Sequence, residues 1–388
     1  MRGESDPPAD GKPTFRSLPL PQREISLLIV LCVLCAITFG ATRRMASWSR
    51  GRRAEAAAEW FARGEALTQA GQLDAGIAAL REAMAEERQN PIYVLGLARR
   101  LTEAKRHDEA TQLLLQLRRG QPDDVEVNYG LARLAALNGD EAEAVRYYNY
   151  AMYGLVRIGV DYNRREIRTE LINFLLDEGA QQEARIELEA LGRELPDEPE
   201  ANLQAAQLAD RAGDTRRSLE FYGRTAALDP THAGAAAGVG NAAFVLRDFT
   251  TASREMARAI SLGADAPRLA TRLEVSQLVQ NSDPLAPRVA SAVRARRLRA
   301  GLVNAASGYD ACVAESDADQ ESPDATQVEL RALTRGRQSS LQDPDVLARG
   351  VTLIGEVTAA IQARCPTRLT PLDQAWQLIA ELHPGGDR

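Results

Sequence analysis

The chain has 388 residues, of which 45% are hydrophobic and 26% are charged. Ala and Leu are abundant, and this composition suits a folded helical protein. The net charge is −7, which argues against general nucleic-acid binding, because that function normally needs an excess of basic charge on one face.

The N-terminal region divides into a polar stretch and an apolar one. Residues 1–24 contain five prolines among Gly, Asp and Glu, so we predict a disordered tail. Residues 25–42 carry no charge, and 18 such residues are long enough to cross a bilayer as one helix. Three alternatives compete with a membrane anchor: a signal peptide, a lipoprotein signal and a buried core helix. Residues 38–41 are a poor cleavage site, and Leu31 and Leu34 precede the cysteines where a lipoprotein signal needs a small residue.

Residues 43–56 are expected to form a basic helical connector that leads into the next element. The connector contains Trp48 and several arginines, and at a membrane interface such residues often lie among lipid headgroups. A plain charged linker explains the same composition.

Residues 57–267 contain a unit of helix, turn and helix six times over, and the unit recurs at a nearly constant spacing with one longer step. Small residues occupy two registers 12 positions apart, because bulky side chains would hold closely crossing helices apart. The first register holds Gly64, Ala98, Ala132, Ile172, Ala206 and Gly240, with Ile172 as the exception. The second holds Gly76, Ala110, Ala144, Ala184, Ser218 and Ala252. Four residues later, a register of large residues holds Leu80, Leu114, Tyr148, Leu188, Tyr222 and Met256.

These registers resemble the tetratricopeptide repeat (TPR) family, whose unit is about 34 residues long. The first unit shows the resemblance best, in Trp60, Gly64, Leu67, Gly71, Leu80 and Ala83. The resemblance covers about 210 of the 388 residues and indicates a bacterial TPR protein with an N-terminal membrane anchor. It implies an all-α fold, a right-handed α-solenoid of about six hairpins whose concave face is lined by the first helix of each unit.

Two rows of residues are expected on that face. The polar row holds Glu65, Arg99, Arg133, Asn173, Gln207 and Asn241. The second row, four residues earlier in each unit, is mostly apolar and holds Phe61, Leu95, Tyr129, Thr169 and Leu203. The resemblance implies that such a groove binds partner proteins or peptides. One TPR subclass clamps a C-terminal carboxylate with Lys and Asn, but Phe61 and Glu65 stand where the first such pair would be expected, so that ligand is not assigned.

The longer step lies between the third and fourth units, where five of the nine tyrosines cluster. Tyrosine offers contact area with a polar tip, so a contact patch is one interpretation. Packing of a lengthened helix against its neighbour is the other.

After the array, residues 268–283 are expected to form a capping helix and residues 284–388 a small C-terminal helical domain. Within that domain we predict helices over residues 288–315, 345–364 and 371–383, with an acidic loop at 316–324. Cys312 and Cys365 are the only cysteines outside the apolar segment, and they are either a disulfide or two unrelated buried thiols.

The side of the membrane on which the array lies is open from the sequence. More arginines follow the apolar segment than precede it, and the positive-inside rule therefore favours a cytoplasmic array. A disulfide would require an oxidising compartment. We expect a single-pass protein of the inner membrane with the array on the extracytoplasmic side.

The sequence contains no recognisable catalytic or metal-binding arrangement. Its three histidines, His107, His232 and His383, lie far apart, with no His or Cys at metal-ligand spacing near them. Phosphate-binding loops and nucleophile elbows are also missing from the sequence. We therefore expect no enzyme activity and no cofactor.

The resulting hypothesis is a membrane-anchored TPR scaffold that binds proteins in its groove and helps to assemble or maintain an envelope complex. The alternative is a non-catalytic accessory factor for envelope polysaccharide or enzyme assembly that acts through the C-terminal helices. A third role is self-association through the anchor, with the array as a spacer between copies.

Overall fold

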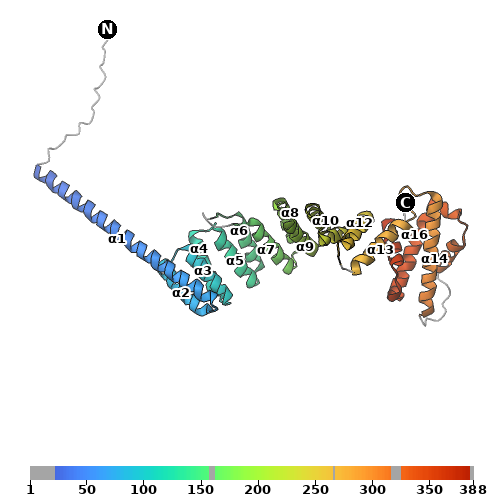
Figure 1. The fold of residues 1–388 in the computed structure, drawn as a ribbon, viewed down its shortest axis with the longest axis horizontal. Coiled ribbons are helices and arrows are strands. Elements are labelled where there is room, and N and C mark those ends of the chain that lie inside the picture. The colour runs from blue at the N-terminus through green and yellow to red at the C-terminus, as the bar shows by residue number, and fades with distance from the viewer. Residues whose placement is uncertain (1–21, 157–161, 265–266, 316–324, 385–388) are drawn as a thin grey trace, which may run out of the picture. The chain divides into compact units, whose positions relative to one another are not determined.

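A computed structural model describes residues 22–156, 162–264, 267–315 and 325–384 (Figure 1). Within these ranges all regular secondary structure is helical, as predicted. The only β-bridge there is an isolated one between Asp124 and Leu155. The chain divides into two compact units, residues 1–160 and 161–388, and each is described separately.

The first unit contains three helical hairpins formed by six consecutive helices. Their bounds are α1 Gln22–Gln69, α2 Leu73–Glu86, α3 Pro91–Glu103, α4 His107–Gly120, α5 Val125–Leu137 and α6 Glu141–Tyr153. Each odd-numbered helix packs against the helix that follows it, and α2 and α4 also contact the first helix of the next hairpin.

The second unit contains three more hairpins and five further helices. The hairpin helices are α7 Arg164–Asp177, α8 Gln181–Glu194, α9 Pro199–Arg211, α10 Thr215–Leu228, α11 Ala233–Val245 and α12 Phe249–Ser261. The remaining helices are α13 Pro267–Ser282, α14 Ser291–Glu315, α15 Ala325–Arg335, α16 Pro344–Arg364 and α17 Pro371–Leu382, with short 3₁₀ turns at Ser340–Gln342 and Pro366–Arg368. The sequence analysis did not predict α15.

The two small-residue registers meet where the helices of a hairpin cross. All twelve of their residues are buried, Ile172 included. A Cβ added to Gly76 would lie 2.9 Å from the carbonyl oxygen of Gly64, and one added to Gly240 would lie 2.6 Å from Met256 Cγ. Ser218 fits the same register because it is small and its hydroxyl donates a hydrogen bond to Asp210. The hairpins therefore pack through the residues that define the repeat.

The turn inside each hairpin requires a left-handed backbone conformation. The residue before the N-cap of the second helix has a positive φ in all six hairpins, and these residues are Gly71, Lys105, Gly139, Gly179, Gly213 and Arg247. Glycine adopts this conformation without a steric penalty, whereas Lys105 and Arg247 carry a Cβ that disfavours it. In three hairpins an Asp follows as N-cap and accepts a backbone N–H bond from the first turn: Asp140, Asp214 and Asp248.

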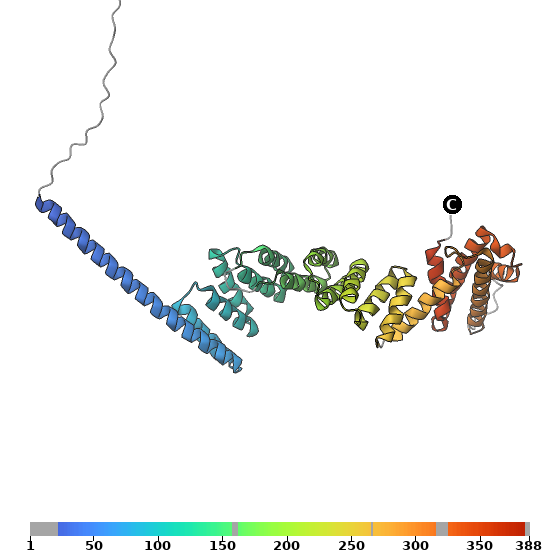
Figure 2. The ribbon, with the colours of Figure 1, turned by 45° about the horizontal axis from the view of Figure 1, so that its top comes forward.

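Helix α1 is continuous from Gln22 to Gln69, so the apolar segment, the basic connector and the first repeat helix form one element. It also includes the last three residues of the predicted tail, and residues 1–21 lie outside the described part of the chain. Its apolar window has a mean hydropathy of 1.6 and is 0% buried, and in both views it projects away from the hairpins of its own unit (Figures 1 and 2). Length and composition suit a membrane span or a signal sequence, and the exposure argues against a core helix.

The longer step between the third and fourth units does not lengthen a helix. Helix α6 has 13 residues, and the additional residues lie in the connection between α6 and α7. Tyr147 and Tyr148 are buried, whereas Tyr150 and Tyr153 are exposed. The tyrosine cluster therefore divides between the hairpin interior and the surface.

The C-terminal helices share a core with the last hairpin. This core contains Phe249 of α12, Val275 of α13, Leu298 of α14, Ile354 of α16 and Trp376 of α17. Helices α14, α16 and α17, which lie in the predicted C-terminal domain 284–388, thus pack together with α13 and the last hairpin within the second unit. Helix α16 has a window of mean hydropathy 1.3, but nearly half of that window is buried because the helix lies in this core.

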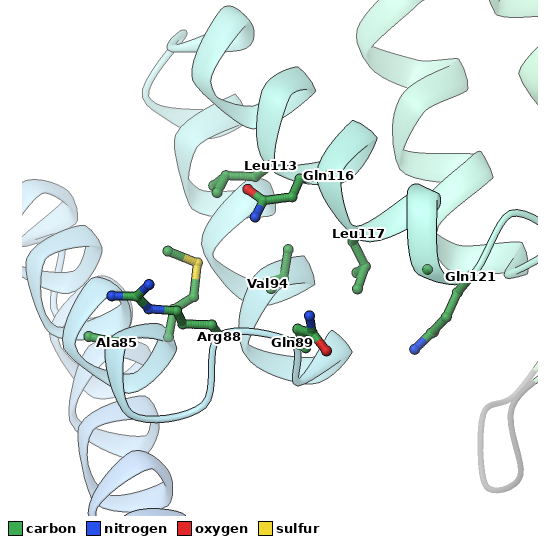
Figure 3. Close-up of a pocket in the computed structure, with 10 residues that line it drawn as sticks. Ala85, Arg88, Gln89, Val94, Leu113, Gln116, Leu117 and Gln121 are labelled. Atoms are coloured by element: carbon green, nitrogen blue, oxygen red, sulfur yellow. The ribbon is translucent and has the colours of Figure 1, made fainter.

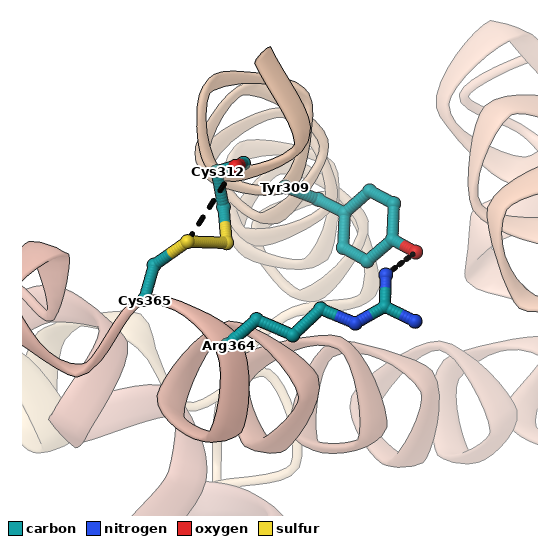
Figure 4. Close-up of a disulfide and its surroundings, with 4 residues drawn as sticks. All are labelled: Tyr309, Cys312, Arg364 and Cys365. Carbon is teal, nitrogen blue, oxygen red and sulfur yellow. Dashed lines mark hydrogen bonds between the residues drawn. A yellow bond between two sulfur atoms is a disulfide. The ribbon is translucent and has the colours of Figure 1, made fainter. Parts of the chain in front are cut away.

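Cys312 of α14 and Cys365, directly after α16, form a disulfide with a Cα–Cα distance of 5.9 Å (Figure 4). Beside it, Arg364 donates a hydrogen bond of 3.1 Å to the hydroxyl of Tyr309. The predicted loop at 316–324 lies outside the described residues. The disulfide therefore joins α14 to the end of α16, two elements that α15 separates in the sequence.

Candidate partner-binding face

The residues of the predicted rows lie on the first helices of the hairpins. In the first unit, α1 carries Phe61 and Glu65, α3 carries Leu95 and Arg99, and α5 carries Tyr129 and Arg133. In the second unit, α7 carries Thr169 and Asn173, α9 carries Leu203 and Gln207, and α11 carries Asn241. Three residues of the polar row therefore lie in the first unit and three in the second.

Arginines of the next helix along the face contact three residues of the polar row. Arg100 donates to Glu65 at 2.6 Å, Arg211 to Asn173 at 2.5 Å and Arg272 to Asn241 at 2.7 Å. Each bond joins the first helix of one hairpin to the next helix along the face: α1 to α3, α7 to α9 and α11 to α13. Glu65 and Asn173 therefore connect neighbouring hairpins, and Asn241 connects the sixth hairpin to α13.

These arginines could not be found from the repeat pattern. Arg100 follows the polar-row position by one residue, Arg211 follows it by four, and Arg272 lies beyond the sixth hairpin. A long guanidinium side chain reaches the same kind of acceptor from several positions, so no fixed spacing results.

The two arginines of the polar row lie in the first unit. Arg99 and Arg133 are both exposed, and the guanidinium of Arg133 lies 4.5 Å from the ring centroid of Tyr129. Leu95 and Tyr129 are half-buried beside them. The carboxylate of Glu65 is paired with Arg100. The row of the first unit consequently presents positive charge next to apolar surface.

Phe61 has a structural role in the same unit. Its ring packs against Tyr93 with a centroid distance of 5.2 Å, and a Cβ on Gly96 would lie 2.6 Å from its Cε2. The side chain therefore fills the contact between α1 and α3, and it offers a partner less surface than the sequence suggested.

Among the described residues, a cavity beside the hairpins includes one predicted residue. In the second unit, a cavity of about 360 Å³ lies between α7, α8 and α9, with Thr169 in its wall. Leu191, Leu195 and Leu208 contribute apolar surface, and Glu198 and Glu200 contribute acidic groups. This cavity brings Thr169 of the predicted row together with residues of the neighbouring hairpin.

Another cavity, of about 500 Å³, lies at the ends of α2 and α4 and the start of α3 (Figure 3). Val94, Leu113 and Leu117 provide apolar surface, while Arg88 and Gln116 are polar. None of the predicted row residues lines it. Sequence reasoning missed this hollow because it depends on how the second helices of two hairpins diverge.

Six helical hairpins with these registers define a helical repeat protein. Residues 67–134 match the family described as tetratricopeptide repeat. The chain therefore contains tetratricopeptide repeats, and the registers of the matched residues continue through all six hairpins.

Several solved structures are similar to parts of this chain. One is the C-terminal part of a TPR protein from Cytophaga hutchinsonii, with 11% identity over 67% of this chain and 96% of that chain and a TM-score of 0.42. Another is pilF of Pseudomonas aeruginosa, with 16% identity over 56% and 96% and a TM-score of 0.38. A third is YrrB, described as a TPR protein with an unusual peptide-binding site, with 18% identity over 50% and 95% and a TM-score of 0.38.

TM-scores this low do not establish a shared overall architecture. The assignment therefore depends on the repeat match and on the hairpins themselves. No curated protein matches the chain.

Proposed function

We propose that the protein is a membrane-anchored, non-catalytic scaffold that binds a partner protein or peptide on its first-helix face and helps to assemble or maintain an envelope complex. The observation that carries this proposal is the pair of exposed arginines, Arg99 and Arg133, beside half-buried Leu95 and Tyr129. Arginine and tyrosine are enriched in protein interfaces, and a segment with acidic and apolar side chains complements this surface.

The ion pairs of Arg100 support an acidic partner segment. Glu65 is paired with Arg100, and Arg100 also pairs with Glu103 at 2.9 Å. The one acidic residue of the polar row is thus engaged within the protein. An acidic partner segment would gain charge pairing with Arg99 and Arg133 without competition from Glu65.

The proposed location is the inner membrane, crossed once by the apolar segment of α1, with the repeats on the extracytoplasmic side. The disulfide between Cys312 and Cys365 supports this side, because such bonds persist in oxidising compartments and are rare in reducing ones. Both remaining cysteines, Cys32 and Cys35, lie within the apolar segment.

Capture of partners from solubilised membranes tests the proposed face. Arg99→Glu together with Arg133→Glu should lower the recovery of specifically bound proteins about tenfold, since two attractive contacts become repulsive. Arg119→Glu together with Arg216→Glu is the matched control, because both arginines are exposed and lie on second helices. Unchanged recovery with the first variant would contradict the proposed face and direct attention to the C-terminal helices.

A further inference from the structure

The segment of α1 that follows the apolar stretch has an unusual charge distribution. Between Glu24 and Glu55 the chain contains no acidic residue, whereas five arginines lie between positions 43 and 53: Arg43, Arg44, Arg50, Arg52 and Arg53. All five are exposed, and none forms an ion pair with another described residue. Their charge is therefore not balanced within the described protein.

The arginines surround the helix and do not form one face. At 3.6 residues per turn, they point in directions of about 0°, 100°, 340°, 180° and 280°. A docking face for a protein would require a single stripe. A ring of charge suits an environment that encloses the helix on all sides, as the headgroup layer encloses a helix that leaves a bilayer.

Trp48 lies in the same segment as these arginines. Trp48 is 64% exposed, and Arg52 lies 5.4 Å from its ring centroid. Trp48 is six residues beyond Thr42, which is about 9 Å of helix rise. At this distance from the apolar stretch, tryptophan and arginine meet the interface between hydrocarbon and water.

We infer that residues 43–53 form a collar that binds the phosphates of anionic lipids at the membrane surface. This inference rests on the proposed membrane anchor and adds the class of lipid that surrounds it. It also accounts for the arginines if the repeats are extracytoplasmic, where the positive-inside rule would not place them. Because α1 is continuous, the collar and the first helix of the first hairpin belong to the same helix.

The test uses the full chain in vesicles of phosphatidylcholine that contain phosphatidylglycerol as the minor, anionic component. In parallel samples, the same mole fraction of one lipid or the other carries bromine near the headgroup end of its acyl chain. The Trp48 signal is the difference between the wild type and Trp48→Phe. We expect brominated phosphatidylglycerol to quench it about threefold more than brominated phosphatidylcholine, because basic residues concentrate anionic lipid, and raising the salt to about 0.5 M should reduce the preference.

Arg50→Gln, Arg52→Gln and Arg53→Gln together should reduce the preference by more than half and leave insertion intact, because Arg43 and Arg44 remain beside the apolar stretch. The matched control replaces Arg119, Arg216 and Arg268, which are exposed elsewhere, with Gln. Equal quenching by the two lipids in an inserted wild-type protein would overturn the collar and leave the anchor standing. Failure of the protein to sediment with vesicles, together with no quenching by either lipid, would overturn both.

Discussion

Two hairpins of the second unit contain buried polar side chains that are paired within the protein. Arg168 of α7 is almost completely buried and forms ion pairs with Glu187 and Glu194 of α8. In the next hairpin, burial and the hydrogen bond to Asp210 raise the pKa of the Tyr222 phenol. These polar groups lie inside hairpins, where an unpaired partner would be costly.

Removal of the buried cation should destabilise the second unit. We expect Arg168→Ala to lower the free energy of unfolding by about 3–5 kcal/mol, because two carboxylates lose their partner and a cavity forms. Urea unfolding of the full chain, followed by circular dichroism, measures this change. Arg168→Met should cost less, since it retains most of the volume. A loss no larger than that of Arg216→Ala, at an exposed site of α10, would contradict the structural role.

The turn residues lead to a stabilising substitution. Lys105 is exposed and has a φ of 59°, at the position where four of the six hairpins have glycine. Lys105→Gly should raise the free energy of unfolding by about 0.5–1 kcal/mol, because glycine adopts this conformation without the Cβ clash. Gly139→Ala, at the equivalent turn, should have the opposite sign in the same unfolding experiment. If both substitutions destabilise, the backbone argument is wrong.

At the scale of elements, the C-terminal helices depend on contacts that are distant in the sequence. Helix α17 packs on both α13 and α16, and His383 beyond its end contacts the carboxylate of Asp283 at 3.1 Å. A Cβ on Gly301 of α14 would lie 2.2 Å from the ring of Trp376. The end of the array is therefore closed by a helix that lies far along the chain from α13.

The disulfide should stabilise this closure. Cys312→Ala together with Cys365→Ala should lower the free energy of unfolding of the C-terminal helices by about 2–4 kcal/mol, since a loop of 53 residues is no longer closed. Hydrogen exchange of the full chain should show faster exchange in α14 and α16 and no change in α3 and α5. Cys32→Ala with Cys35→Ala is the control. Equal protection of α14 with and without the disulfide would contradict this role.

At the scale of the whole molecule, the redox state of the cysteines reports the compartment in which the repeats lie. Alkylation of thiols in protein from acid-quenched cells, before and after reduction, tests the proposed location. We expect two cysteines to react without reduction under denaturing conditions and four after it, because Cys312 and Cys365 are oxidised outside the cytoplasm. Four reactive thiols before reduction would place the repeats in a reducing compartment.

The periodic features of this protein were predictable from the sequence. The six hairpins were found because their contacts join residues 12 to 16 positions apart and recur with the period of the repeat, so packing leaves a regular pattern of small and large side chains. The apolar segment was also recognisable from the sequence, because a helix that crosses a bilayer needs a continuous run of apolar residues.

Other features became visible only in the tertiary structure. The partners of Glu65 and Asn173, the cavity beside Val94 and the packing of α17 against α13 depend on side chains that meet from unrelated positions. Such contacts have no period, and their energies depend on distance in space. The sequence alone therefore determined the helical repeats and the candidate anchor. The tertiary structure decided which row residues remain exposed to a partner and how the last hairpin is closed.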